Sequence, residues 1–598
     1  MKFKLRHPDN PFESVQEHII LGRNVPPEKV PTFLSDIGVK NNYDDFGLNN
    51  LHDAAEKLAS AIFQNKKVLV IVDSDCDGYT SSAILINYLY RIAPVWTQSN
   101  LEYFLHSGKQ HGLNDSYKKA IAEDFSLVIV PDAGSNDYTE HEILNSHFID
   151  VIILDHHEAP QVSKYATVIN NQLSDYPNKF LSGAGVVWQF CRYFDKINNS
   201  NYADEFLDLV ALGNCADMMD MRSPETAGLI NEGFREENLK NPFVKGIREK
   251  NAYSLGQQIT PMGAAFYISP FVNAIVRSGT IEEKTLVFNS MLEFKANEEI
   301  LSTKRGHSLG EKETIVSQAL RVVTNVKNRQ SKKEQEGMAF VEGQIEKNNL
   351  MSNQVLLFTI HEGEIDRNII GLVANRIMSK YQRPVCILNE TKHYNNDTVE
   401  KSNTYEVWYE GSARGCNAAD VANFKDICEQ TGVIEYAAGH QGAFGLGIKA
   451  ENIDAFIKST NEILKDMPNE PVYYVDYIWE NEVKADVIQE IASTFEMLWG
   501  TGFEESYVGI QNLKIPVAAA TLMKRGTFKI ELPGISLIKF NMPETEYWKL
   551  TAERTEIVLN IYGKPDLNTW NGHTYPQLII SEYELVNINE VSNLGLYF

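Results

Sequence analysis

The sequence predicts an α/β fold with four parts: a domain built on a parallel sheet, a long connecting helix, a second α/β domain and a C-terminal β-barrel of the OB type. Short apolar runs that end in acids or histidines indicate strands buried on both faces of a parallel sheet. A charged stretch with one apolar stripe indicates the long helix. A series of short β-like runs near the C-terminus indicates the barrel.

Composition narrows the class of protein. The 598 residues suffice for roughly three or four domains, and 43% apolar residues are enough for packed cores. No apolar run approaches the ~20 residues that a membrane helix needs, and the first residues lack a signal-peptide core, so we expect a cytoplasmic protein with no membrane partner. The six cysteines form no CxxC pair, which indicates reduced thiols, neither a disulfide framework nor a zinc site. A net charge of −25 argues against non-specific coating of duplex nucleic acid but permits a narrow basic channel.

The stretch KVLVIVDSDCDGYTSSAILIN (67–87) organises the first domain. Its run Val68–Val72 is too short for a globular helix and rich in β-branched residues, which is typical of a buried strand. Three carboxylates follow at alternate positions, Asp73, Asp75 and Asp77. Open α/β sheets bind ligands at the carboxyl ends of their strands, and acids this close repel one another unless a divalent cation holds them. The stretch therefore predicts a metal site.

Two other readings of this loop are weaker. A single acid at a strand-to-helix turn is usually a helix cap, which explains Asp77 but not three acids. An EF-hand calcium loop needs a bidentate acid at its twelfth position, where this chain has Ile84, and it needs flanking helices. The hydroxyls of residues 80–82 are expected to cap a helix that begins near Ala83.

Two further apolar runs also end in potential metal ligands. Residues 126–130 lead into Asp132, and residues 151–154 lead into Asp155, His156 and His157. A fourth strand is expected over 166–170. The apolar helical stretch 206–212 is followed by Asp217, which is a plausible fourth carboxylate beside this cluster.

The second half of the chain carries three glycine-bearing turns with basic or hydroxyl groups, which suit phosphate binding. They lie at 371–376, 411–414 and 438–442. Residues 390–404 are expected to form a polar surface loop, and 467–470 a linker. Short strands are expected at 507–510, 517–522, 528–532, 537–540, 557–561 and 578–581. The predicted organisation is a lead-in over 1–50, the parallel-sheet domain over 51–307, the connecting helix over 308–335, the second α/β domain over 336–466 and the OB-fold-like domain over 467–598.

Taken together, the motifs resemble a known family. DSDCDG (73–78), PDAG (131–134), DHH (155–157) and ALGNCADMMDM (211–221) resemble the DHH phosphoesterase superfamily. Further similar segments are SPFVNAIVR (269–277), NVKNRQ (325–330), GLVANRI (371–377), GSAR (411–414) and AGHQGAFG (438–445). LNTWNGHTYPQLII (567–580) is similar to the OB-fold of RecJ-type exonucleases. The chain departs from the family pattern at His106 and Phe271, where arginine is usual, and at Ala438, which replaces a glycine.

The resemblance implies a 5′→3′ exonuclease that hydrolyses single-stranded DNA to mononucleotides with two divalent metal ions, Mn²⁺ preferred and Mg²⁺ the alternative. Single-stranded DNA, a single-strand-binding protein and a helicase are the implied partners. Asp77, Asp132, His156 and Asp217 would hold one ion, and Asp73, Asp75 and Asp132 the other. His157 would meet substrate phosphate, and Asp155 would orient a histidine.

The resemblance also implies a set of substrate contacts. Arg277, Ser412 and Arg414 would lie near the terminal 5′-phosphate, and the further contacts are Asn273, Gly439, His440 and Trp570. A surface salt bridge for Arg277, a packed turn for His440 and a core position for Trp570 stay open as alternatives. Two other functions also stay open: a phosphodiesterase for short oligonucleotides, cyclic dinucleotides or small phosphate monoesters, and a replication scaffold without activity. The first usually lacks the C-terminal β-rich segment, and the second has lost ligands that this chain retains.

Overall fold

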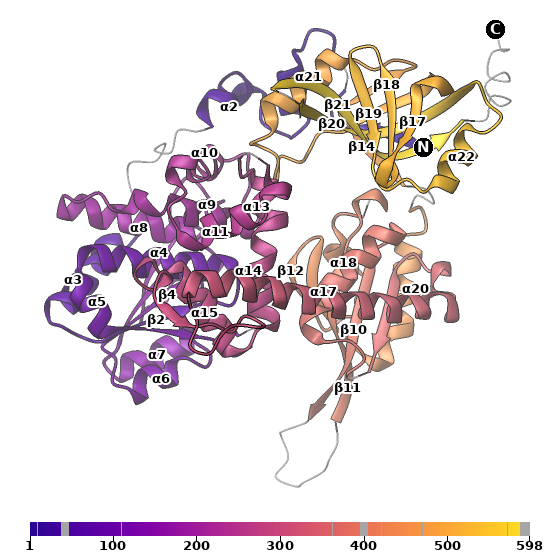
Figure 1. Ribbon diagram of the computed structural model, residues 1–598. Coiled ribbons are helices and arrows are strands. Elements are labelled where there is room, and N and C mark those ends of the chain that lie inside the picture. Colours follow the sequence, from indigo (N-terminus) through magenta and orange to yellow (C-terminus); the bar gives the residue numbers. More distant parts are fainter. Residues whose placement is uncertain are drawn as a thin grey trace. The chain divides into compact units, whose positions relative to one another are not determined.

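The structure is a computed structural model that forms two compact units (Figure 1). The described residues are 1–8, 10–37, 47–108, 110–256, 258–361, 363–394, 405–419, 421–467, 471–570 and 572–586. The parallel-sheet unit comprises Arg23–Asn328 and Phe495–Glu505. The composite unit comprises Met1–Gly22, Arg329–Thr494 and Ser506–Phe598.

The parallel-sheet unit is built on five parallel strands in the order β3-β2-β4-β5-β6. They are β2 (Val68–Val72), β3 (Leu101–Leu105), β4 (Leu127–Pro131), β5 (Asp150–Asp155) and β6 (Thr167–Asn170). The four predicted strands are confirmed, and β2 and β4 are buried at every position, as expected for a sheet covered on both faces. The apolar pattern did not predict β3, because most of its residues stay partly exposed.

The order of the strands creates a topological switch point at the carboxyl ends of β2 and β4. β3 and β4 lie on opposite sides of β2, so the chain connections diverge at the carboxyl ends of β2 and β4. Figure 1 shows helices on both faces of the sheet, with α4 and α8 on one side and α6 and α7 on the other. Three helices of this unit, α4 (Cys76–Ile92), α8 (Gly183–Asn198) and α9 (Leu207–Ala216), each pack against the other two.

Further helices complete this unit. They are α2 (Val30–Asp36), α3 (Leu51–Phe63), α5 (Pro94–Asn100), α6 (Tyr117–Ala122), α7 (Tyr138–Ser146), α10 (Pro224–Gly233), α11 (Pro242–Lys250), α12 (Ala252–Leu255), α13 (Pro261–Tyr267), α14 (Ser269–Ser278), α15 (Ile281–Met291) and α16 (Glu293–Ala296). The long helix α17 (Ile315–Lys347) starts later and ends later than the predicted range 308–335. The helix continues beyond residue 335 because Val341 and Ile345 are buried in an apolar core formed with the helix and strands that follow in the sequence.

The first sheet of the composite unit has five strands in the order β12-β13-β11-β10-β9. Its elements are β9 (Leu356–Ile360), α18 (Ile370–Tyr381), β10 (Val385–Tyr394), β11 (Tyr405–Arg414), α19 (Phe424–Gln430), β12 (Tyr436–His440), β13 (Ala443–Lys449) and α20 (Ile453–Ile463). Helix α18 packs on one face with α17, and α19 and α20 contribute to the core on the other face. Most of the predicted surface loop, residues 395–404, and residues 468–470 of the predicted linker lie outside the described residues.

The second sheet of this unit has seven strands in the order β15-β16-β20-β21-β19-β18-β17. They are β15 (Tyr477–Glu480), β16 (Val508–Pro516), β17 (Ala520–Met523), β18 (Thr527–Leu532), β19 (Ile535–Lys539), β20 (Glu556–Trp570) and β21 (His573–Leu585). The runs predicted at 557–561 and 578–581 are parts of two long strands that pair along almost their whole length. The run predicted at 517–522 begins with a 3-10 turn at Val517–Ala519, so its strand starts three residues late.

The N-terminal residues belong to the composite unit. β1 (Lys2–Leu5) pairs in parallel with β14 (Val472–Val475), and α1 (Val15–Leu21) follows. Phe3 packs over Gly509, where a side chain would collide with its ring. The expected lead-in is therefore an ordered strand and helix, which local patterning missed because the partner strand lies more than 460 residues away in the sequence.

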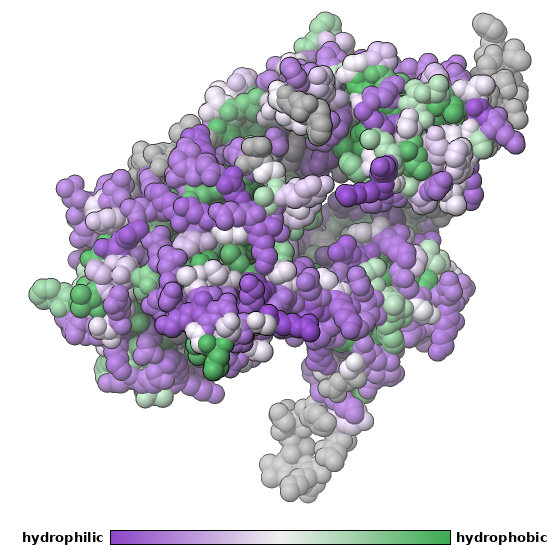
Figure 2. Space-filling model, viewed as in Figure 1, coloured by the Kyte–Doolittle hydropathy of each residue, from purple (hydrophilic) through white to green (hydrophobic). Residues whose placement is uncertain are grey.

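The visible surface of each unit is mostly hydrophilic, with small separate hydrophobic patches (Figure 2). This agrees with the excess of acids over bases in the composition. Among the described residues, no helix is both long enough and apolar enough to cross a membrane.

Candidate metal centre

The loop after β2 brings two of its three acids to the start of α4. Asp75 caps the helix, and its Oδ1 accepts a hydrogen bond of 2.9 Å from the Gly78 N–H. Gly78 is required because a Cβ there would lie 2.6 Å from Asp73 atoms. The predicted start near Ala83 is therefore wrong: the acid at 75 already caps the helix, and the hydroxyls of Thr80 and Ser81 donate back to carbonyls of its first turn.

Asp77 is buried against the start of α8, which supplies three donors. The Ser182 hydroxyl and the Ala184 N–H donate to Oδ1 at 3.0 and 3.1 Å, and the Gly183 N–H donates to Oδ2 at 2.7 Å. Gly213 of α9 also lies close, since a Cβ there would be 2.3 Å from the Asp77 Oδ1. Three donors hold this carboxylate in one orientation.

Asp132, His156 and Asp217 converge on the same place from β4, β5 and the end of α9. The His156 Nε2 lies 3.2 Å from the Asp132 Oδ1, 3.3 Å from the Asp217 Oδ2 and 4.0 Å from the Asp77 Oδ2. Asp132 has a φ of 64°, an uncommon left-handed conformation for a residue with a side chain. It is 1% exposed, yet neither of its oxygens has a hydrogen-bond partner among the described residues.

A second group of acids shares Asp132. Asp73, Asp75 and Asp132 each place a carboxylate oxygen within 4.8 Å of the other two, and Asp77, His156 and Asp217 do the same with one ligand atom each. The structure thus brings together all six residues that the sequence predicted as metal ligands. Gly183 makes this approach possible, because a Cβ there would lie 2.4 Å from the Asp132 Oδ1.

The electrostatics of this cluster favour a cation. Burial and the neighbouring acids raise the pKa of Asp132 well above its usual value, and burial followed by Asp77 and Asp75 does the same for the pKa of Asp217. Burial lowers the pKa of His156 to about 4, so its ring is neutral near pH 7 and Nε2 is a lone-pair donor. Unpartnered buried oxygens, mutually repelling acids and a neutral imidazole fit divalent metal ions of the Mn²⁺ and Mg²⁺ kind.

Asp155 anchors the two histidines that follow it. Its oxygens accept hydrogen bonds from the backbone N–H groups of Ser135, His156 and His157, and from the His157 Nδ1 at 2.8 Å. It orients the ring of His157, and it holds only the backbone of His156. Burial opposes protonation of His157, but the hydrogen bond and charge of Asp155 outweigh it and raise the pKa of His157 to about 9. A half-exposed imidazolium therefore stands beside the neutral metal-ligand candidate.

The structure adds functional candidates that the sequence did not reveal. The His111 Nδ1 lies 2.8 Å from the Asp73 Oδ2, and the Gly112 N–H donates to the other oxygen at 3.1 Å. The buried Lys284 donates to the carbonyls of residues 106–108, which support the preceding part of this loop. His111 lies in a polar loop without periodicity. The only sequence signal that points to it is the glycine that follows it directly, Gly112.

Two predicted substrate contacts on α14 lie close to the acids. The Asn273 Oδ1 accepts a 3.2 Å hydrogen bond from the Cys76 N–H and so positions the first turn of α4. Arg277 is partly buried, and within the described chain it makes no hydrogen bond or ion pair. Burial lowers its pKa, whereas the charge of Asp75 raises it. Two positions differ from the family pattern, which usually has arginine there. His106 is buried, and its Nδ1 lies 2.7 Å from the Asp115 Oδ1, whereas Phe271 is partly exposed.

The composite unit carries the other predicted contacts. Ser412 and Arg414 occupy alternate positions of β11, and the sheet register pairs Arg414 with Ala443 and Ala443 with His440. The Arg414 Nε donates to the Asn375 Oδ1 of α18 at 2.7 Å. Gly371 makes room for the guanidinium, since a Cβ there would lie 2.6 Å from it.

The remaining two predicted contacts are less informative. Gly439 has a φ of 127°, which a side chain would strain, and it precedes the exposed His440 at the end of β12. Trp570 ends β20, but its side chain lies outside the described residues.

Comparison with known proteins places these features in a family. Residues 67–214 match the DHH family, N-terminal domain, and residues 479–582 match the RecJ OB domain. A Bacillus subtilis (strain 168) protein provisionally named as the SPbeta prophage-derived single-strand DNA-specific exonuclease YorK is 35% identical over 549 residues, which are 91% of this chain and 92% of that protein. The single-stranded-DNA-specific exonuclease RecJ of the same organism is 24% identical over 91% of this chain and 65% of its own length.

Solved structures share the fold. RecJ from Thermus thermophilus in complex with Mn²⁺ aligns with a TM-score of 0.69 at 18% identity, over 98% of this chain and 80% of that chain. The same protein in complex with Mg²⁺ aligns with a TM-score of 0.62 at 18% identity, over 98% and 79% of the two chains. Because the likeness to YorK extends over nearly the full length of both sequences, this chain belongs to the RecJ-like family of DHH phosphoesterases.

Proposed function

We propose that this protein is a metal-dependent exonuclease that degrades single-stranded DNA from the 5′ end to mononucleotides by two-metal hydrolysis. The observation that carries the proposal is the Asp132 carboxylate, which is buried, lacks hydrogen-bond donors among the described residues and lies close to both groups of candidate ligands. A bridging ligand of two cations needs this arrangement. The substrate class follows from YorK and RecJ, which are named as exonucleases specific for single-stranded DNA.

The candidate ligands divide into two sets. Asp77, Asp132, His156 and Asp217 would hold one cation, and Asp73, Asp75 and Asp132 the other. Two bound cations lower the pKa of the attacking water and stabilise charge on the phosphoryl group and the departing oxygen. Carboxylates with one imidazole suit Mn²⁺ and Mg²⁺, the ions named for the Thermus structures.

The other side chains of the site act on the substrate directly. Asp155 raises the pKa of His157 to about 9, and the ring is half exposed, so His157 can donate to a phosphate oxygen while Asp155 holds it. Arg277 is a partly buried cation without a protein ion pair in the described chain, and its guanidinium offers paired donors to a substrate phosphate. Both groups would orient the strand while the acids hold the metal ions.

Direction requires a group that holds one terminus, because a phosphodiester looks similar from either side. We assign this role to Ser412 and Arg414, a hydroxyl and a guanidinium on one face of β11 beside the small residue Gly371. His440 and Gly439 at the end of β12 would add donors to the same face. In the family pattern this terminus is the 5′-phosphate.

The C-terminal sheet would hold the rest of the strand. On β21 the exposed Tyr575 lies near His573, with ring centroids 6.4 Å apart and the ring planes tilted by 46°. Exposed aromatic rings on an OB-fold stack on bases without regard to sequence. Because this sheet could hold additional nucleotides of single-stranded DNA, long single strands are the favoured substrates. Short oligonucleotides and cyclic dinucleotides, which other DHH enzymes take, would not need this sheet.

The proposal is tested with purified protein, Mn²⁺ and single strands that carry a label at either the 5′ or the 3′ end. The 5′ label should appear at once as a mononucleotide, while the 3′-labelled strands shorten gradually. Asp132→Asn is the inactive control. Immediate release of the 3′ label would reverse the assigned direction, cleavage of dinucleotides alone would make the enzyme a short-oligonucleotide phosphodiesterase, and absence of any hydrolysis would favour the scaffold.

A further inference from the structure

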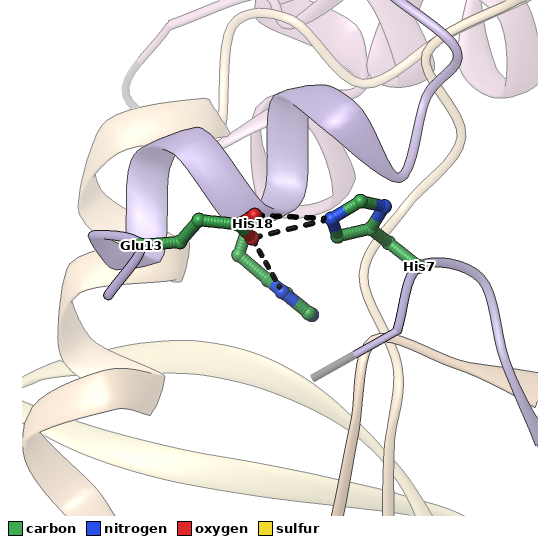
Figure 3. Close-up of side chains that lie close together, drawn as sticks. All are labelled: His7, Glu13 and His18. Atoms are coloured by element: carbon green, nitrogen blue, oxygen red, sulfur yellow. Dashed lines mark hydrogen bonds and ion pairs between the residues drawn. The ribbon is translucent and has the colours of Figure 1, made fainter. Parts of the chain in front are cut away.

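A cluster of two histidines and one glutamate lies in the composite unit, outside the acid cluster of the parallel-sheet unit. Its members are His7 after β1, Glu13 just before α1, and His18 within α1. Figure 3 shows both rings directed at the Glu13 carboxylate. A capping box between Ser14 and Glu17 starts the helix and thereby fixes the backbone next to Glu13.

The separations in this cluster match a metal coordination sphere. The Glu13 Oε2 lies 3.2 Å from the His7 Nε2 and 3.5 Å from the His18 Nδ1. Two ligand atoms that are each ~2.05 Å from a tetrahedral zinc ion lie about 3.3 Å apart. The His18 to Glu13 distance is also at the upper limit for a hydrogen bond.

The orientation of His18 is the second observation. This residue is 2% exposed, and its Nε2 lies 2.7 Å from the backbone carbonyl oxygen of Asp476, so this nitrogen carries the hydrogen. In the neutral ring Nδ1 therefore presents a lone pair, and it is directed at the carboxylate with no hydrogen-bond partner among the described residues. Two lone pairs facing each other repel, and a cation between them removes the repulsion. A carbonyl that fixes the far nitrogen is the usual support of a metal-bound histidine.

Further contacts prepare the other ligands. The Asn10 Nδ2 donates to the Glu13 Oε1 at 2.9 Å, and the His7 Nε2 lies 3.3 Å from the same oxygen. The other oxygen, Oε2, is buried without a hydrogen-bond partner in the described chain and is the candidate ligand atom. The ring of His18 stacks on Tyr477 with centroids 4.5 Å apart. The site is thus preorganised by an amide, a carbonyl and an aromatic ring.

We propose that His7, Glu13 and His18 bind one divalent transition-metal ion of the zinc class, with water as the fourth ligand. Two imidazoles and a carboxylate are a known zinc ligand set. The ion would join the loop after β1 to α1, while His18 remains tied to Asp476 between β14 and β15. It would therefore hold the N-terminal segment on the C-terminal part of the chain. The site uses no cysteine, which is why the cysteine pattern did not predict it.

The test measures zinc stoichiometry in the full-length protein. Metal-free protein is titrated with Zn²⁺ against a chromophoric chelator, for the parent and for His7→Ala and Glu13→Gln. Because the acid cluster would also bind metal ions, the informative quantity is the difference, and each variant should bind one equivalent fewer than the parent. His52→Ala is the matched control, since His52 lies 3.3 Å from Glu56 in an exposed pair without a third ligand, and it should bind the parent's number.

A second measurement follows the N-terminal strand itself. Zn²⁺ should slow deuterium exchange of the β1 amides in the parent at least tenfold, because the ion holds His7 next to this strand. Exchange in His7→Ala should not respond to Zn²⁺. Equal zinc stoichiometry in the parent and both variants, or β1 exchange in the parent that ignores Zn²⁺, would overturn the proposal and leave an ion pair between Glu13 and protonated histidines.

Discussion

Replacing Asp132 with asparagine should separate metal binding from folding. The substitution keeps the shape of the side chain but removes one negative charge from the centre of the acid cluster. Two unit charges about 4 Å apart interact by about 4 kcal/mol at an effective dielectric constant of 20, and a divalent ion doubles this to about 8 kcal/mol. Even the smaller figure corresponds to roughly a thousandfold in dissociation constant. Metal-dependent hydrolysis should therefore be lost at Mn²⁺ concentrations that saturate the parent.

The metal-free protein should respond in the opposite direction. Burial and the charges of Asp77, Asp75 and Asp73 raise the pKa of Asp132 in the folded state. An acid whose folded pKa exceeds its unfolded value destabilises the fold once the pH rises past the unfolded value, and asparagine removes this penalty near pH 7. Its amide can also donate to the His156 Nε2, which lies 3.2 Å from the Asp132 Oδ1, for about 1 kcal/mol more.

Thermal unfolding with and without Mn²⁺ measures both effects. At a hundred times its dissociation constant the ion stabilises the parent by about 2.7 kcal/mol, or about 5 °C for a domain of this size. Asp132→Asn should show no such shift and a higher metal-free midpoint. Asp208→Asn is the control, because Asp208 is a buried acid of the same unit that binds backbone N–H groups outside the cluster. Equal Mn²⁺ shifts in Asp132→Asn and the parent, or a lower metal-free midpoint, would refute the reasoning.

Three other predictions test separate parts of the molecule. Gly183→Ala should abolish metal-dependent hydrolysis in a nuclease assay, because its Cβ would lie 2.4 Å from the Asp132 Oδ1, whereas Gly343→Ala, which meets open space, should keep parental activity. Arg414→Ala should lower the rate on 5′-phosphorylated strands about tenfold, since a charge-assisted contact contributes about 1.5–3 kcal/mol; an equal loss on 5′-hydroxyl strands would contradict its role. Burial lowers the pKa of His141 to about 4, so the unfolded state takes up its proton first as the pH falls below about 6.5. Urea unfolding of the parent should therefore lose about 2 kcal/mol more than that of His141→Leu between pH 7 and 5, and identical losses would show that His141 does not titrate in this way.

The sequence by itself determined the parallel sheet and most of the candidate metal centre. The strands β2, β4 and β5 are continuous apolar runs, so the local sequence is sufficient to predict that they are buried. Parallel strands end at the same edge of a sheet, and the acids and histidines that follow these runs must therefore meet there. For this reason Asp77, Asp132 and His156 could be placed together before any contact was known.

The tertiary structure decided the features whose partners are distant in the sequence. Asp73 receives His111 from a loop without periodicity, and Asn273 binds the start of α4 from almost two hundred residues away. β20 continues through Gly563 and Pro565 because it pairs with β21, although these residues weaken the strand pattern. His18 is aligned by a carbonyl 458 residues away. Local patterning reports which face of an element is apolar, whereas only the folded chain determines which distant group meets it.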